Sequence, residues 1–257
     1  PVVGLKRDRI QIDEAKQHNK NGLCIRIDLN DLENGTLSSD LEKFIENNNL
    51  SLSNTDLVVD MGSIEEQRPI LVENLARTFF QSIPNISVWR NLILIASAFP
   101  ASMGVVQKND TKQVERVEWD VWKKIMADPE FNRTPLFGDY GIQHPDGVED
   151  FDPRYMTPSA AIRYTLDETW FLVKGESMKH KGGGQFRGLS KILMGTDNYY
   201  GDTHCGGCAG VQQCASGELP ARSLEVWRKL GTAHHYTVVV KQLDQLSFQE
   251  SASTLQK

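Results

Sequence analysis

The sequence predicts an α/β protein: a (β/α) TIM-barrel-like fold that lacks its first strands, followed by an α+β C-terminal extension. Five short apolar segments recur through the first 145 residues, helical patterns fill the gaps between them, and the composition changes after about residue 146. Strands that alternate with helices are typical of a parallel sheet, because each parallel connection needs a crossover that a helix can provide.

The five apolar segments are the predicted strands. They are nearly continuous in Val, Ile and Leu, which indicates strands that are covered on both faces. Their bounds are Val2–Leu5, Leu23–Leu29, Leu57–Met61, Leu92–Phe99 and Leu136–Ile142.

Apolar residues at three- and four-residue steps predict the helices between these strands. One helix begins near Ser38 or Ser39, both of which are N-cap residue types. Two more are expected over 64–83 and 111–127, and a weaker signal covers 13–20.

An open doubly wound sheet and a closed barrel both satisfy this order of elements. Polar residues gather at the ends of the strands, where barrel enzymes carry their sites, so the barrel is favoured. The glycine fingerprint of dinucleotide-binding sheets follows none of the strands. We therefore assign residues 1–146 to a barrel part, and we expect earlier strands to precede Pro1 in a longer protein.

The C-terminal part has a different composition and a different order of predicted elements. A linker is expected over 146–158, and Ala161–Thr165 with Trp170–Lys174 predicts a β-hairpin. The sequence then predicts, in order, a helix over 185–194, an irregular segment over 195–221, a helix over 222–230 and a strand over 236–243. We assign 159–246 to the α+β extension and 247–257 to a flexible tail.

The composition limits the class of protein. A net charge of −6 argues against a protein that coats nucleic acid through bulk charge. Apolar runs stay far below the length of about 18 residues that a membrane span needs. The four cysteines, three of them in one Gly-rich segment, do not form a disulfide framework, so a cytoplasmic location is expected.

Polar residues at the strand ends form the first candidate site. Two or three carboxylates with a histidine can hold Mg²⁺ or Mn²⁺ or perform acid–base chemistry. The alternative is structural: Arg26 pairs with Asp28 or Asp60, and Asp139 caps a turn. The candidate catalytic residues are Arg26, Asp28, Asp60, Asp139 and His144, with Ser97 beside them.

The second candidate is a zinc site. A Cys-x2-Cys pair is half of a common zinc site, and His204 or Cys214 would supply further ligands to Cys205 and Cys208. His234 and His235 would serve only where the fold brings them near. The alternative is a Gly-rich loop that contains ordinary thiols.

A basic, Gly-rich segment is the third candidate. It runs from Lys179 to Gly184 and precedes a predicted helix, so its backbone N–H groups, with Lys179, Lys181 and Arg187, would accept a phosphate. The alternative is a mobile basic loop.

Dispersed short motifs carry a resemblance to a known family. They are Pro1-Val-Val-Gly-Leu5, Arg26-Ile-Asp-Leu29, Leu57-Val-Val-Asp60, Phe137-Gly-Asp-Tyr140, Trp170, Trp227-Arg228 and Gly231-x3-His235. Over essentially its whole length the chain resembles the phage-type "beta protein" family of phages and bacteria, which is often encoded near mobile or defence-related genes. The resemblance implies a barrel with earlier strands, so that Pro1–Leu5 corresponds to roughly the fourth strand. It implies no established reaction and no catalytic residues.

Two functions from different classes follow. The first is a phage-related or anti-phage defence protein that binds another protein through exposed aromatic side chains. The alternative is a metal-dependent phosphodiester or nucleotide hydrolase that uses Asp28, Asp60 and Asp139, with nucleic acid or a nucleotide as its ligand. The aromatic candidates are Trp170, Tyr199, Tyr200 and Trp227.

Overall fold

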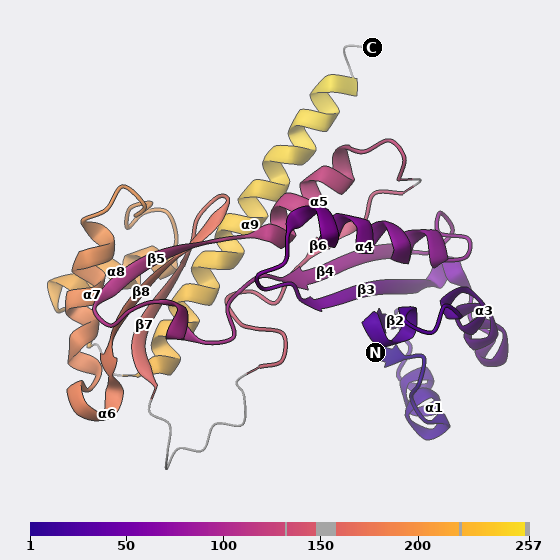
Figure 1. The fold of residues 1–257 in the computed structure, drawn as a ribbon, viewed down its shortest axis with the longest axis horizontal. Helices are drawn as coiled ribbons and strands as arrows, with labels where there is room; N and C mark the ends of the chain where they lie inside the picture. The colour runs from indigo at the N-terminus through magenta and orange to yellow at the C-terminus, as the bar shows by residue number, and fades with distance from the viewer. Residues whose placement is uncertain (132, 148–157, 221–222, 255–257) are drawn as a thin grey trace. The chain divides into compact units, whose positions relative to one another are not determined.

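The computed structural model describes residues 1–131, 133–147, 158–220 and 223–254, and it contains two compact units (Figure 1). Unit 1 comprises Pro1–Ala98 and Val117–Tyr140, and unit 2 comprises Phe99–Arg116 and Gly141–Lys257. The chain therefore leaves unit 1 after Ala98, contributes a segment to unit 2 and returns to unit 1 at Val117.

Unit 1 is built on a parallel sheet with the strand order β1-β2-β3-β4-β6. Its helices connect successive strands, and α4 and α5 lie side by side (Figure 1). The strands are β1 Val2–Gly4, β2 Leu23–Asp28, β3 Thr55–Ser63, β4 Asn91–Ser97 and β6 Leu136–Gly138. The helices are α1 Arg9–Gln17, α2 Leu29–Leu32, α3 Leu37–Asn48, the 3-10 turn η1 Leu52–Asn54, α4 Pro69–Ser82 and α5 Val117–Ala127.

The α/β class and the parallel sheet predicted from the sequence are confirmed. Ile25, Ile27, Leu57 and Val59 are fully buried, as expected for strands with covered faces. Among the described residues, β1 and β6 each pair with a neighbour on one side only. The sheet that the structure shows is therefore open at both edges, and no barrel closure is seen in it.

Unit 2 is built on an antiparallel sheet with the order β5-β8-β7. The hairpin and the helix expected over 185–194 are confirmed. The strands are β5 Asp110–Glu115, β7 Ser159–Thr165 and β8 Thr169–Ser177. The helices are the 3-10 turn η2 Met103–Val105, α6 Met178–Lys181, the 3-10 turn η3 Gly183–Gln185, α7 Phe186–Met194, α8 Gly206–Ser216 and α9 Leu224–Thr254.

Tyr164 of β7, Cys208 of α8 and Trp227 of α9 belong to one buried cluster that joins the sheet of unit 2 to its helices. Trp227 stacks on Phe186 with ring centroids 4.6 Å apart, and Trp170, with none of its surface exposed, meets Phe99 edge to face. The prediction that Trp170 and Trp227 are exposed is therefore wrong: both rings pack in the interior of unit 2.

The segment 111–127 is not one helix. Its first part is the strand β5, which pairs with β8 so that Val114 lies opposite Trp170. The turn to α5 occurs at Arg116, a buried residue that donates hydrogen bonds to the carbonyls of Leu166 and Asp167. The spacing of Val114 and Val117 matched a helical period, although the two residues belong to different elements and different units.

The strand predicted over 236–243 is also wrong, because these residues lie within α9, which runs beside β7 (Figure 1). Val, Thr and Tyr favour strands, but tertiary packing overrides such preferences. His234, His235 and Val238 follow one another at helical spacing and are all buried. The packing of this helical stripe thus decides the local structure.

Two further expectations differ from the structure in part. The segment 195–221 was predicted as irregular but contains α8, and α9 extends to Thr254, through much of the predicted tail. Most of the predicted linker, 148–157, lies outside the described residues. Among the helices that the structure describes, none is both long enough and apolar enough to cross a membrane.

Candidate metal centre

The Cys-x2-Cys pair lies at the start of α8. Cys205 is the N-cap residue of this helix, and its Sγ accepts a hydrogen bond from the backbone N–H of Cys208 at 3.3 Å. This turn brings the two sulfur atoms to 3.5 Å from each other. A single helical turn therefore presents both thiols to one point, which is the geometry that a shared metal ion requires.

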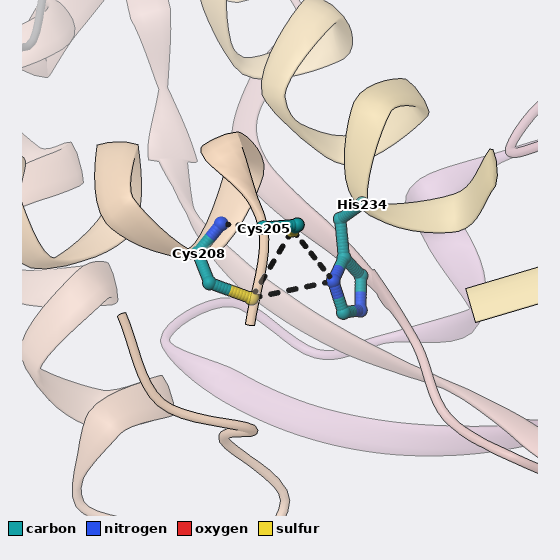
Figure 2. Close-up of side chains that lie close together, drawn as sticks. All are labelled: Cys205, Cys208 and His234. Carbon is teal, nitrogen blue, oxygen red and sulfur yellow. Dashed lines mark hydrogen bonds between the residues drawn. The ribbon is translucent and has the colours of Figure 1, made fainter. Parts of the chain in front are cut away.

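His234 completes the group from the facing helix α9 (Figure 2). Its Nδ1 lies 3.5 Å from Cys205 Sγ and 3.3 Å from Cys208 Sγ. Its Nε2 lies 2.8 Å from the carbonyl oxygen of Thr165. Because a carbonyl only accepts, Nε2 carries the proton, and the lone pair of Nδ1 points toward the two sulfur atoms.

Burial keeps Cys208 and His234 uncharged in the absence of a metal. Cys208 and His234 are almost completely buried, whereas Cys205 is partly exposed. Burial raises the pKa of the Cys208 thiol to about 12 and lowers the pKa of His234 to about 4. The imidazole is therefore neutral at physiological pH, the state in which histidine binds metals.

Aromatic side chains enclose the group. The Tyr164 ring stacks on His234 with centroids 3.8 Å apart, and its hydroxyl lies 3.1 Å from Cys208 Sγ. The hydroxyl of Tyr199 donates to the carbonyl of Cys208 at 2.9 Å. These contacts fix the orientation of both ligand residues before any ion binds.

Two glycines allow α8 to approach α9. A Cβ atom on Gly207 would lie 2.9 Å from His234 Cβ and 3.1 Å from His234 N, and still closer to the carbonyl of Leu230. A Cβ atom on Gly210 would meet the Leu230 side chain. The Gly-rich sequence around the cysteines is thus a packing requirement, because it brings the thiols within reach of His234.

These three residues are the one group of three or more His, Cys, Asp or Glu side chains in the described parts of the chain whose ligand atoms all lie within 4.8 Å of one another. Of the predicted ligands Cys205, Cys208, Cys214 and His204, the structure brings the first two together with His234. Cys214 lies six residues further along α8, which is about 9 Å along the helix axis.

The strand-end residues of unit 1 form a different arrangement. Asp60 accepts hydrogen bonds from Arg26 Nε at 2.6 Å, from the Tyr140 hydroxyl and from the backbone of Gly62 at 2.8 Å. Asp28 lies opposite Asp60 in the sheet register. Tyr140 was not among the predicted site residues, although it stands next to Asp139 in the sequence.

Asp28 serves as the N-cap of α2. Its side chain accepts from Asn30 N at 2.9 Å, and Asp31 accepts from Asp28 N in return, which together form a capping box. Asp28 and Arg26 also line a cleft of about 340 Å³ beside β1. The carboxylates of Asp28 and Asp60 thus both have structural roles at this edge of the sheet.

The remaining strand-end candidates are distributed over both units. Asp139 directly follows β6, and Ser97 is the last residue of β4 and is fully buried. His144 belongs to unit 2, where its Nδ1 accepts from the backbone N–H of Asp146 at 3.3 Å.

Two of the three candidate phosphate residues contact other groups of the protein. Arg187 donates to the carbonyls of Ala215 and Ser216 at the end of α8, at 3.3 and 3.0 Å. Lys181 lies 3.9 Å from a carboxylate oxygen of Glu176, and Lys179 is exposed on α6. Arg187 thus satisfies carbonyl groups at a helix C-terminus.

A family model with the description Beta protein matches residues 1–241. The match covers most of the chain, so the chain belongs to the Beta protein family, as the motifs in the sequence predict. No curated protein and no solved structure matches the chain.

Proposed function

We propose that this member of the Beta protein family binds one zinc ion at Cys205, Cys208 and His234, and that the ion has a structural role in unit 2. The observation that carries the proposal is the convergence of two thiols and one imidazole nitrogen, all within 4.8 Å of one another. Thiolate and imidazole ligands in a buried tetrahedral site are typical of zinc.

The surroundings favour a structural ion over a catalytic one. The cavity beside His234 has a volume of about 10 Å³, room for no more than about one water molecule. An ion at this point would join α8 to α9 and, through the His234–Thr165 hydrogen bond, to β7. Zinc would then cross-link the helices of unit 2 to each other and to its three-stranded sheet.

We further propose that the chain acts by binding another protein, in a phage-related or anti-phage defence setting. The roles of Asp28 as a helix cap and of Asp60 as the partner of Arg26 support this over the metal-dependent hydrolase. Tyr236 and Val240, one turn apart on α9, are 61% and 57% exposed and offer an apolar contact surface. The parallel sheet of unit 1 would belong to a (β/α) barrel.

Elemental analysis of the full chain, purified under reducing conditions, tests the zinc proposal. We expect about one zinc per chain in the natural protein and a large loss in the Cys208→Ser variant. Cys24→Ser, in β2 of unit 1, is the matched control and should keep its zinc. A natural protein that contains no zinc and takes up none when zinc is added under these conditions would contradict the proposal.

A phage-challenge assay tests the binding proposal. Asp28→Asn keeps a good N-cap residue but removes the carboxylate charge, so we expect the phenotype of expressing cells to be unchanged. Replacing Tyr236 and Val240 by Ser should abolish it. The opposite pattern would support the hydrolase and refute partner binding through α9.

A further inference from the structure

His204 lies directly before the first cysteine of the zinc site. Its ring centroid is 5.7 Å from that of His234, and it meets the ring of Tyr200 at 4.9 Å. Its Nε2 atom is buried, and no hydrogen-bond partner for it is found among the described residues. His204 therefore brings a second imidazole to the same small region of unit 2.

A buried imidazole nitrogen without a partner needs an explanation. Leaving such a group unsatisfied is costly, because it loses its hydrogen bonds to water, and native proteins contain few of them. The neighbouring polar groups are used elsewhere: Lys241 approaches the backbone carbonyl of His204, and Asp167 accepts from the Tyr200 hydroxyl at 3.0 Å. A metal ion on Nε2 would satisfy the atom.

The spacing of the two imidazole rings agrees with this explanation. Zinc–nitrogen bonds of about 2.0–2.1 Å at a tetrahedral angle place two coordinated rings roughly 5 Å apart, centroid to centroid. The observed 5.7 Å is close to that value, but neither nitrogen of His204 lies within 4.8 Å of all three other ligand atoms, so the His204 side chain must rotate toward the ion to bind it. Cys205, Cys208 and His234 are already in place, so one ligand position is left for His204.

We propose that His204 is the fourth ligand, so that the centre is a closed Cys2His2 site with no position for water or substrate. The inference rests on the proposed zinc centre and deepens it, because a fourth protein ligand excludes Lewis-acid catalysis by the ion. The alternative is that His204 only packs against Tyr200 and that a water molecule is the fourth ligand of the zinc ion.

X-ray absorption spectroscopy of the zinc-loaded full chain distinguishes these alternatives. We expect two sulfur and two imidazole ligands in the natural protein, and one imidazole with one oxygen in His204→Ala. His180→Ala, on the exposed face of α6, is the matched control and should retain both imidazoles. In a competition titration, His204→Ala should bind zinc more weakly by at least about tenfold.

The outcomes separate this inference from the proposed function. Zinc bound by two sulfurs and a single imidazole in the natural protein would overturn the role of His204 and leave the zinc centre standing. A chain that binds no zinc at all would overturn both. The imidazole count of the natural protein decides the matter even where His204→Ala fails to fold.

Discussion

Gly207→Ala is the perturbation that tests the geometry of the metal centre most sharply. The added methyl group would lie 2.9 Å from His234 Cβ, whereas carbon atoms in contact are about 3.5–4.0 Å apart. Relief of the clash requires α8 to move away from α9 by up to about 1 Å. Metal–ligand distances tolerate only about 0.2 Å, so Cys208 and His234 would no longer meet at one ion.

The size of the effect follows from the cost of overpacking. Forcing extra carbon into a well-packed interior costs about 1–3 kcal/mol. A loss of that size corresponds to a fall in zinc affinity of roughly 5- to 150-fold. We expect this loss in a titration against a chelating indicator, together with a lower midpoint of thermal unfolding for the variant.

Gly206→Ala is the matched control, because a Cβ atom at Gly206 meets no other atom within 4 Å. Removing a helical glycine there should leave zinc affinity unchanged and stabilise the helix by up to about 1 kcal/mol. If Gly207→Ala binds zinc as tightly as Gly206→Ala does, the close approach of α8 and α9 does not position the ligands, and the proposed geometry is refuted.

Three other predictions concern protons and buried polar contacts. Zinc affinity should rise at least about tenfold per pH unit between roughly pH 6 and 8, because zinc displaces the proton of the Cys208 thiol, whose pKa is raised by burial. His234, with a pKa lowered to about 4, releases no proton in this range, and a zinc affinity that does not change with pH would contradict the assignment of Cys208 as a ligand. Arg116→Met should lower the free energy of unfolding by about 1–3 kcal/mol, since the buried carbonyl of Leu166 loses its donor whereas the carbonyl of Asp167 keeps Gln242; an unchanged denaturation midpoint would refute that role. Tyr140→Phe should cost about 1 kcal/mol in the same assay, because Asp60 keeps its bonds to Arg26, and a loss above about 3 kcal/mol would mean that Tyr140 has a further role.

The parallel sheet was predictable because local pattern and tertiary role agree in its strands. Ile25 and Ile27 in β2, and Leu57 and Val59 in β3, lie in apolar segments that are long enough for strands and too short for helices. Closure into a barrel was not predictable in the same way, because it depends on which strands meet at the edges and not on any one segment.

The wrong predictions of secondary structure occur where tertiary packing overrides the local preference for a strand or a helix. Tyr236 to Val240 has the composition of a strand, yet it is helical because His234, His235 and Val238 bury one stripe of α9. Val114 and Val117 have helical spacing, yet the buried side chain of Arg116 marks a turn between two elements. Neither the stripe nor the turn is visible in a short window of sequence.

Half of the metal centre was readable from the sequence. Cys205 and Cys208 have a spacing that itself predicts half of a zinc site, because three residues are about one helical turn. His234 follows Cys208 by 26 positions, and only the packing of α9 on α8 brings it near. The one local signal for it was the pair of glycines at Gly207 and Gly210, which indicates a close approach of another element.

Thermal unfolding of the full chain with and without zinc tests the structural role of the ion most directly. Zinc at about 1,000 times its dissociation constant should stabilise the fold by about 4 kcal/mol. For a domain of this size that corresponds to a rise of roughly 8–16 °C in the unfolding midpoint. A midpoint that stays the same after a chelator has removed all zinc would contradict the claim that Cys205, Cys208 and His234 hold a structural ion.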